Sequence, residues 1–174
     1  MQNDIIACKQ LGADGVVLGM LDLDGRVDSG RTLELVNLAV PLKVTYHRAF
    51  DLSSDLLRSL RDLQTTGVHC ILTSGGEKTA AEGADTLKQL VEAADGSLNI
   101  MAGGGIEEDN VGDLIEQTGV REIHASVKFP MASRMRYQNP KISLGAVEGR
   151  EYERFIVLQE NVRNLLRAAR ERKS

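Results

Sequence analysis

The sequence has few aromatic residues, few cysteines and no excess of positive charge. Aromatic side chains make up 3% of the 174 residues, tryptophan is absent, and the formal net charge is −4. Proteins that bind nucleic acids usually carry basic patches or aromatic side chains on which bases stack. The composition therefore argues against nucleic acid as a partner. The basic residues near the C-terminus are expected to face water at the end of a helix.

The two cysteines, Cys8 and Cys70, belong to no Cys-x-x-Cys motif. Two such cysteines in an acidic chain indicate free thiols in a reducing compartment, and we interpret both as small buried apolar residues. The N-terminal residues lack a basic region followed by an apolar run, and no apolar stretch approaches the ~20 residues that span a bilayer. We therefore expect a cytoplasmic protein with no membrane partner.

Short apolar segments alternate with helical patterns along the chain. One helical pattern precedes the first strand, and each of five predicted strands is followed by another. Gly12, Gly67 and Gly119 each end a helical pattern shortly before a strand, where a left-handed residue is expected. This repetition is typical of βα units in a parallel sheet. The predicted strands are Gly15–Leu21, a segment from Leu42 that ends in His47, Arg48 and Asp51, Val68–Thr73, Leu98–Ala102 and Glu122–Ser126.

The alternation within two strands distinguishes between the possible α/β folds. Thr45 and His47 share one face of their strand, and Glu122, His124 and Ser126 share one face of theirs. A doubly wound sheet has helices on both faces and tolerates such polar rows poorly, whereas a barrel turns one face to its mouth. A full barrel needs eight units and typically about 250 residues. We therefore predict a single domain, residues 1–174, with an incomplete TIM (β/α)8-barrel-like fold: about five parallel strands with outer helices.

The remaining predictions concern the ends of helices and the C-terminal part. Asp28 or Ser29 is expected to cap the helix after the first strand, and Asp51, Ser53 or Ser54 the next helix. An irregular connection is expected from Lys128 to about Gly149. A final helix is expected to carry these apolar residues: Tyr152, Phe155, Ile156, Val162, Leu165 and Leu166.

Polar residues stand at the predicted carboxyl ends of the strands, where ligands of βα folds bind. His47, Asp51 and His124 are candidate catalytic residues, since a neutral histidine can act as a general base or a metal ligand. The alternative for His47 is a structural hydrogen bond. Arg48 stays protonated and is suited either to clamping an anion or to a salt bridge with Asp51. Ser74 is interpreted as a polar lining residue or a helix cap.

Gly103, Gly104 and Gly105 follow the fourth predicted strand, and Ser126 with Lys128 follows the fifth. Backbone N–H groups in such a glycine-rich turn can bind phosphate. A tight turn with positive φ explains any single glycine slightly better, but the location after this strand favours the phosphate interpretation. The candidate ligand-binding residues are Arg48, Thr73, Ser74, Gly75, Gly103, Gly104, Gly105 and Ser126.

The motifs resemble those of the CutC family of copper homeostasis proteins. The matching segments, in the family's order, are His47–Asp51, Leu72–Gly75, Met101–Ile106, His124–Ser126 and Met135–Asn139, with Asn110 after the glycine run. The resemblance implies a TIM barrel, a cytoplasmic location, and a role in binding or handling copper, which is therefore the implied metal.

The sequence also departs from that family. Family members begin with three further strands, so this chain resembles strands four to eight of their barrel. The cysteines proposed to hold copper lie in those missing strands, and Cys8 and Cys70 do not match them. We therefore predict no metal ligand among the residues present. A truncated gene model and an alternative start at Met1 both remain open as explanations.

Two functional hypotheses follow. The first, carried by the resemblance, is a copper homeostasis protein that binds or handles copper. The second is an isomerase or lyase acting on a small phosphorylated or anionic metabolite, so whether the chain is an enzyme stays open. The expected partners are a small-molecule or metal ligand. Since five strands cannot close a barrel, the edges at Gly15–Leu21 and Glu122–Ser126 are also expected to allow homo-oligomers.

Overall fold

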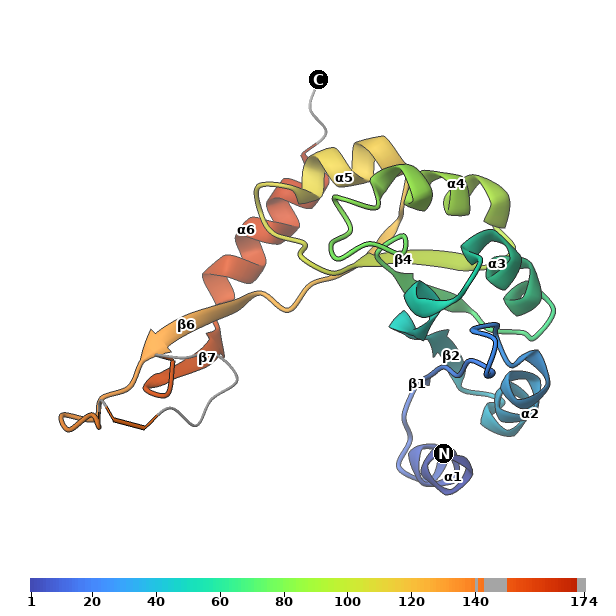
Figure 1. The fold of residues 1–174 in the computed structure, drawn as a ribbon, viewed down its shortest axis with the longest axis horizontal. Helices are drawn as coiled ribbons and strands as arrows, with labels where there is room; N and C mark the ends of the chain where they lie inside the picture. Colours follow the sequence, from blue (N-terminus) through green and yellow to red (C-terminus); the bar gives the residue numbers. More distant parts are fainter. Residues whose placement is uncertain (140, 143–149, 172–174) are drawn as a thin grey trace.

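The computed structural model describes residues 1–139, 141–142 and 150–171 (Figure 1). Helices and parallel strands alternate through most of the chain. The strands are β1 Gly15–Leu18, β2 Lys43–Tyr46, β3 Cys70–Thr73, β4 Asn99–Gly103, β5 Glu122–His124, β6 Lys128–Ala132 and β7 Glu153–Val157. The helices are α1 Gln2–Gln10, α2 Ser29–Ala39, the 3-10 helix η1 Arg48–Leu52, α3 Leu56–Gln64, α4 Ala84–Ala94, α5 Val111–Thr118 and α6 Gln159–Arg170.

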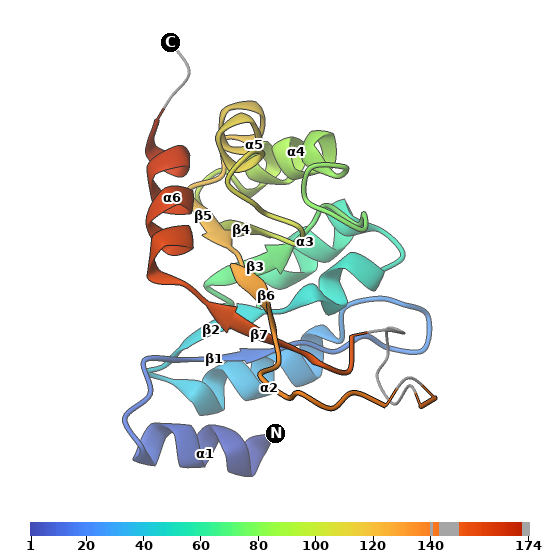
Figure 2. The same cartoon turned by 90° about the vertical axis from the view of Figure 1, so that its left-hand side faces the viewer.

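Strands β1 to β5 form one parallel sheet in the order β1-β2-β3-β4-β5. Figure 1 shows the sheet as an open arch with α2 to α5 along its outer side, and Figure 2 shows the same strands from the open side. The prediction of a five-stranded, incomplete barrel with outer helices is therefore confirmed. Gly12, Gly67 and Gly119 have φ values of 75°, 79° and 72°, which confirms the repeated left-handed residue.

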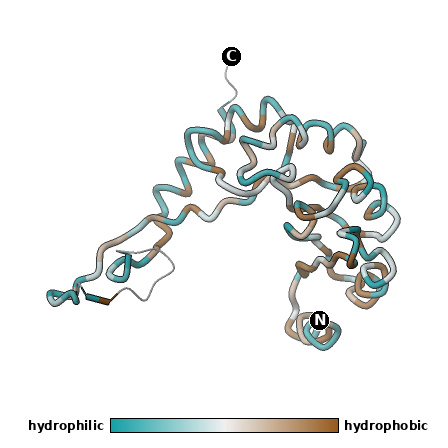
Figure 3. The backbone as a smooth tube through the Cα atoms, viewed as in Figure 1, coloured by the Kyte–Doolittle hydropathy of each residue, from teal (hydrophilic) through white to brown (hydrophobic). Residues whose placement is uncertain are grey.

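The core lies between the sheet and the outer helices. Leu60 and Leu63 of α3, Ile71 of β3, and Leu87 and Leu90 of α4 are fully buried. Figure 3 shows the helices alternating between hydrophilic and hydrophobic residues along their length, as expected when one side of each packs on the sheet. Burial of these apolar side chains holds each βα unit against its neighbours.

The chain after β2 differs from the prediction. The strand ends at Tyr46, and His47 caps η1 by accepting a hydrogen bond from the Ala49 N–H at 3.0 Å. The α3 helix is capped by Asp55, whose side chain accepts from the Arg58 N–H at 2.9 Å, so the predicted caps Asp51, Ser53 and Ser54 were wrong. The extra turn of η1 shifts the cap toward the C-terminus. The Asp28 cap on α2 is confirmed.

The C-terminal prediction was also wrong in part. Strands β6 and β7 pair antiparallel where an irregular connection and the start of a helix were expected, and residues 140 and 143–149 of that connection lie outside the described residues. The run Glu153–Val157 ends in β-branched and aromatic residues that favour strands, and Phe155 and Ile156 therefore lie on β7. In the part of the chain that the structure describes, no helix is both long and apolar enough to cross a membrane.

Candidate functional site

The carboxyl ends of the parallel strands border an open cavity of about 590 Å³. Loops after β2, β4 and β5 contribute to its wall, and Asn161 and Leu165 of α6 line another side. This end of the strands is where ligands bind in βα folds. The residues singled out in the sequence that line the cavity are Arg48, Gly104, Gly105, His124, Ser126 and Lys128.

Arg48 is held in one position at the cavity wall. Its Nε donates to Asp51 Oδ2 at 2.6 Å, and its Nη2 donates to Ser74 Oγ at 2.6 Å and to the Glu77 carbonyl at 3.2 Å. The side chain of Arg48 is 42% exposed, whereas that of Asp51 is only 6% exposed. The guanidinium therefore keeps a solvent-facing side while its other side is fixed by the protein.

Asp51 is the centre of a network behind Arg48. Its carboxylate accepts hydrogen bonds from the Thr73 hydroxyl, from the Ser74 N–H at 3.0 Å and from the Gly76 N–H at 3.1 Å. These donors lie at the end of β3 and in the loop after it, so the network joins that loop to η1. Thr73, Ser74 and Gly75 are all buried, and they support the cavity from behind without lining it.

The glycine run brings backbone close to this arginine. Gly104 has φ +107°, and a Cβ there would lie 3.1 Å from Arg48 Nη1. Gly105 has φ +65°, and a Cβ there would lie 2.9 Å from the side chain of Thr79. Both positions therefore favour glycine through conformation and space. Asn110 fixes the following turn, since its Nδ2 donates to the Gly105 carbonyl at 2.8 Å and its Oδ1 accepts from the Glu107 N–H at 2.9 Å.

The two candidate histidines occupy different positions. His124 ends β5, opposite Gly103 of β4, and its exposed side chain lines the cavity. His47 lies after β2 and is not among the described residues that line the cavity; a Cβ on Gly19 would lie 2.8 Å from its Nδ1. Its Nδ1 accepts the η1 cap hydrogen bond, as in the structural interpretation.

Three polar residues that line the cavity were not predicted from the sequence. Asn161 lies in the first turn of α6, whose start was predicted too early in the chain. Glu107 and Glu108 follow the glycine run and bring carboxylates to the cavity wall. Their position next to a predicted anion-binding turn could have singled them out, because carboxylates there restrict which anions fit.

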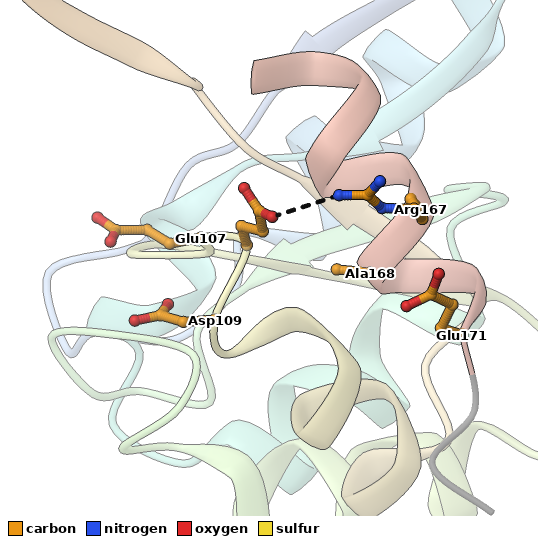
Figure 4. Close-up of a pocket in the computed structure, with 6 residues that line it drawn as sticks. Glu107, Asp109, Arg167, Ala168 and Glu171 are labelled. Carbon is orange, nitrogen blue, oxygen red and sulfur yellow. Dashed lines mark ion pairs between the residues drawn. The ribbon is translucent and has the colours of Figure 1, made fainter. Parts of the chain in front are cut away.

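Glu107 and Glu108 also line a second hollow of about 470 Å³ beside α6 (Figure 4). Glu108 points toward Arg167, with 4.0 Å between their charged atoms, whereas Glu107 and Asp109 point away from the helix. Both side chains of this ion pair are more than half exposed. The arrangement is that of solvated surface charges.

Neither cysteine is placed as a copper ligand. Cys70 begins β3, at the opposite end of the sheet from the cavity. Its burial, and to a smaller extent the nearby Glu122 carboxylate, raise the pKa of the Cys70 thiol to about 12. Cys8 lies on the outer helix α1. Cu(I) prefers thiolate and thioether ligands, so these thiols do not fit a copper site. Among the residues that the structure describes, no group of three or more His, Cys, Asp or Glu side chains is arranged to hold a metal ion.

The chain is similar to known proteins in both sequence and structure. The model of the CutC family matches residues 1–129. A CutC family protein of Chromobacterium violaceum is 42% identical, over 98% of this chain and 68% of that protein. A mouse relative named copper homeostasis protein cutC homolog is 41% identical, over 84% of this chain and 54% of the relative. The chain thus spans only about half to two thirds of the length of these relatives.

Two solved structures share the fold, and one of them is a CutC protein. A CutC structure from Streptococcus agalactiae superposes with a TM-score of 0.67 at 31% identity, covering 71% of this chain and 60% of that one. A structure named Native KDPGal has a TM-score of 0.58 over 98% of this chain and 65% of that chain, at 13% identity, which indicates a shared fold alone. Both neighbours are TIM-barrel proteins. From the matched residues, the sequence identities and the shared barrel geometry, the chain belongs to the CutC family.

Proposed function

We propose that the cavity at the carboxyl ends of the strands binds a small anionic molecule, such as a phosphorylated metabolite. The observation that carries this proposal is the fixed guanidinium of Arg48, held by Asp51 and Ser74 with one side open to the cavity. A charged donor that is already oriented loses little freedom when it binds an anion. Nε and Nη2 of Arg48 donate to Asp51, Ser74 and Glu77, so Nη1 is the nitrogen left to contact the ligand.

Three neighbouring features favour the same ligand class. Gly104 and Gly105 form a turn with positive φ that leaves backbone close to Arg48. Ser126 supplies a hydroxyl and Lys128 a second positive charge on the β5 side of the cavity. His124 lines the same cavity and is the candidate general acid or base for an isomerase or lyase reaction on the bound molecule.

The binding experiment uses inorganic phosphate as its probe, titrated into the protein and followed by NMR. Arg48→Ala is expected to weaken phosphate binding about 10- to 100-fold, because a hydrogen bond to a charged group contributes about 1.5–3 kcal/mol. Arg61→Ala, a change at an exposed arginine on α3, is the matched control and should leave binding unchanged. Equal binding by wild type and Arg48→Ala would refute the proposed site.

A role in copper homeostasis is the second proposal, supported by the names of the mouse and human relatives. The protonated thiol of Cys70 and the separate position of Cys8 favour a role in which these cysteines do not coordinate the metal. In a competition titration with a Cu(I) chelator, the chain should bind no better than a protein with two separated thiols. Tight, stoichiometric binding that Cys8→Ser or Cys70→Ser abolishes would contradict this expectation.

A further inference from the structure

The charged side chains that line the cavity at the carboxyl ends of the strands are balanced in sign. Among the described residues there, Arg48 and Lys128 are positive, whereas Glu107 and Glu108 are negative. A ligand with negative charge alone would therefore meet two carboxylates as well as the guanidinium, and like charges brought close together cost free energy. The lining suits a ligand that carries charges of both signs.

Glu107 and Glu108 differ in what their carboxylates contact. Glu108 lies 4.0 Å from Arg167 of α6, so its charge already has a partner in the protein. Figure 4 shows Glu107 pointing away from that helix, and its side chain is exposed. Within the described part of the chain, no ion pair involves the Glu107 carboxylate. Glu107 is therefore the better placed of the two to bind a cationic group from solution.

The backbone of Glu107 is fixed, although its side chain is exposed. The Glu107 N–H donates to Asn110 Oδ1 at 2.9 Å, and the Glu107 carbonyl accepts from the Val111 N–H at 3.1 Å. The preceding residue, Ile106, is buried in the core. The carboxylate of Glu107 thus extends from a defined point on the cavity wall, which lowers the entropic cost of binding a ligand.

The length of the loop limits how far apart the two charges of such a ligand lie. Gly104 is close to Arg48, since a Cβ there would lie 3.1 Å from its Nη1. Glu107 follows three residues later, and three residues span at most about 11 Å of fully extended chain. A ligand of a few carbon atoms can therefore place one group beside Arg48 and another beside Glu107. A cavity of about 590 Å³ has room for a molecule of that size.

We propose that the ligand of this cavity carries a protonated amine as well as its anionic group, and that Glu107 binds the amine. Small phosphorylated amines are the class that fits, provided that Arg48 binds the anion as proposed above. Nη1 of Arg48 then contacts the phosphate, and the Glu107 carboxylate accepts hydrogen bonds from the ammonium group. Opposite charges meet at both places, whereas a phosphate without an amine leaves Glu107 facing an anion.

Two probes that differ in one group test the proposal. Phosphoethanolamine carries an ammonium group where ethylene glycol monophosphate carries a hydroxyl, and each is titrated into the protein and followed by NMR. The wild-type chain should bind phosphoethanolamine about two- to fivefold more tightly, the gain expected of an exposed ion pair. Glu107→Gln should make the two dissociation constants equal, and thermal melting checks that this variant stays folded.

Asp109→Asn is the matched control, because it removes the same charge from the same loop. Asp109 is not among the described residues that line this cavity, so the variant should keep the preference for phosphoethanolamine. Loss of the preference in Asp109→Asn as well would assign it to the overall charge of the loop and overturn the role of Glu107. A preference that persists in Glu107→Gln would overturn that role too.

The same titrations separate the amine from the anion site on which it depends. Equal binding of both probes by the wild type, with Arg48→Ala weakening both, would leave the anion site standing and overturn the amine proposal alone. Absence of binding by either probe would overturn the anion site, and the amine proposal with it.

Discussion

The Nε of Arg48 lies 2.6 Å from Oδ2 of Asp51, and the two side chains differ sharply in exposure, at 42% and 6%. The carboxylate is thus the buried member of the pair, and it also accepts from the Ser74 and Gly76 N–H groups. Asp51 joins η1 to the loop after β3. Because the same carboxylate also accepts from Arg48, it holds that arginine at the cavity wall.

Asp51→Asn is expected to lower the free energy of unfolding by about 1–3 kcal/mol, since it removes the charge from several buried hydrogen bonds. The matched control is Asp62→Asn, which removes a looser ion pair of 3.9 Å between more exposed side chains, Arg58 and Asp62. That change should cost less than about 1 kcal/mol. Urea unfolding of both variants measures the difference, and equal losses would contradict the central role of Asp51.

Thr32 on α2 is fully buried, and its hydroxyl has no hydrogen-bond partner among the described residues. Thr32→Val should therefore keep stability or raise it by about 1 kcal/mol. Valine has nearly the same shape as threonine and lacks the unsatisfied hydroxyl. Thr118 on α5 is also buried, but its hydroxyl donates to the Leu114 carbonyl at 2.6 Å. Thr118→Val should therefore lower the melting temperature, whereas Thr32→Val should leave it unchanged or raise it. Thermal melts of the two variants measure this difference.

Gly75 and Gly96 have nearly the same backbone conformation, with φ +75° and +71°. A Cβ on Gly75 would lie 2.5 Å from the Gly83 carbonyl oxygen, whereas a Cβ on Gly96 meets nothing within 4 Å. Gly96→Ala should therefore cost only the conformational penalty of about 1–2 kcal/mol. Gly75→Ala adds a backbone clash and should cost clearly more. Similar unfolding midpoints for the two variants would show that the loop after β3 can shift freely.

Burial, with the Glu122 carboxylate, raises the pKa of the Cys70 thiol from 9.0 to about 12. A raised pKa means that the folded state favours the protonated thiol more strongly than the unfolded state does. The resulting stability is complete below about pH 9 and is lost as the pH rises toward 12. The stability difference between wild type and Cys70→Ala should therefore shrink from pH 9 upward.

Urea unfolding at a series of pH values measures this difference, with Cys8→Ala as the correction for general alkaline effects. In the folded protein at pH 8, a thiol-alkylating reagent should also modify partly exposed Cys8 faster than Cys70. Faster modification of Cys70 would contradict the buried, protonated thiol.

The sheet could be predicted because its signals are local. Apolar runs such as Val16 to Leu18, and glycines such as Gly67 and Gly119 at helix ends, each act within a few residues. Asp28 caps α2 by the same short-range chemistry. Helix and strand order follow from such signals, and parallel pairing follows from their alternation.

The site and the pairing of β6 with β7 could not be predicted in the same way. Whether Arg48 pairs with Asp51 or faces a ligand depends on Ser74 and Glu77, which only the folded chain brings to it. The structural role of His47 depends on the turn of η1. The residues before His47 have a strand-like pattern, which does not predict this turn. Pairing of β6 with β7 likewise depends on contacts between segments far apart in the sequence, so the local pattern around Phe155 predicts a helix instead.

The spatial order of the strands matches their order along the chain, from β1 to β5. No strand has to be inserted between two that have already paired, so each new βα unit can join the growing edge as it leaves the ribosome. In every intermediate, the edge of the newest strand is then unpaired only for as long as the next unit takes to be synthesised, whereas the outer edge of β1 stays unpaired. The sheet is thus suited to assembly during translation, in which the speed of synthesis limits how long the growing edge is open to other chains.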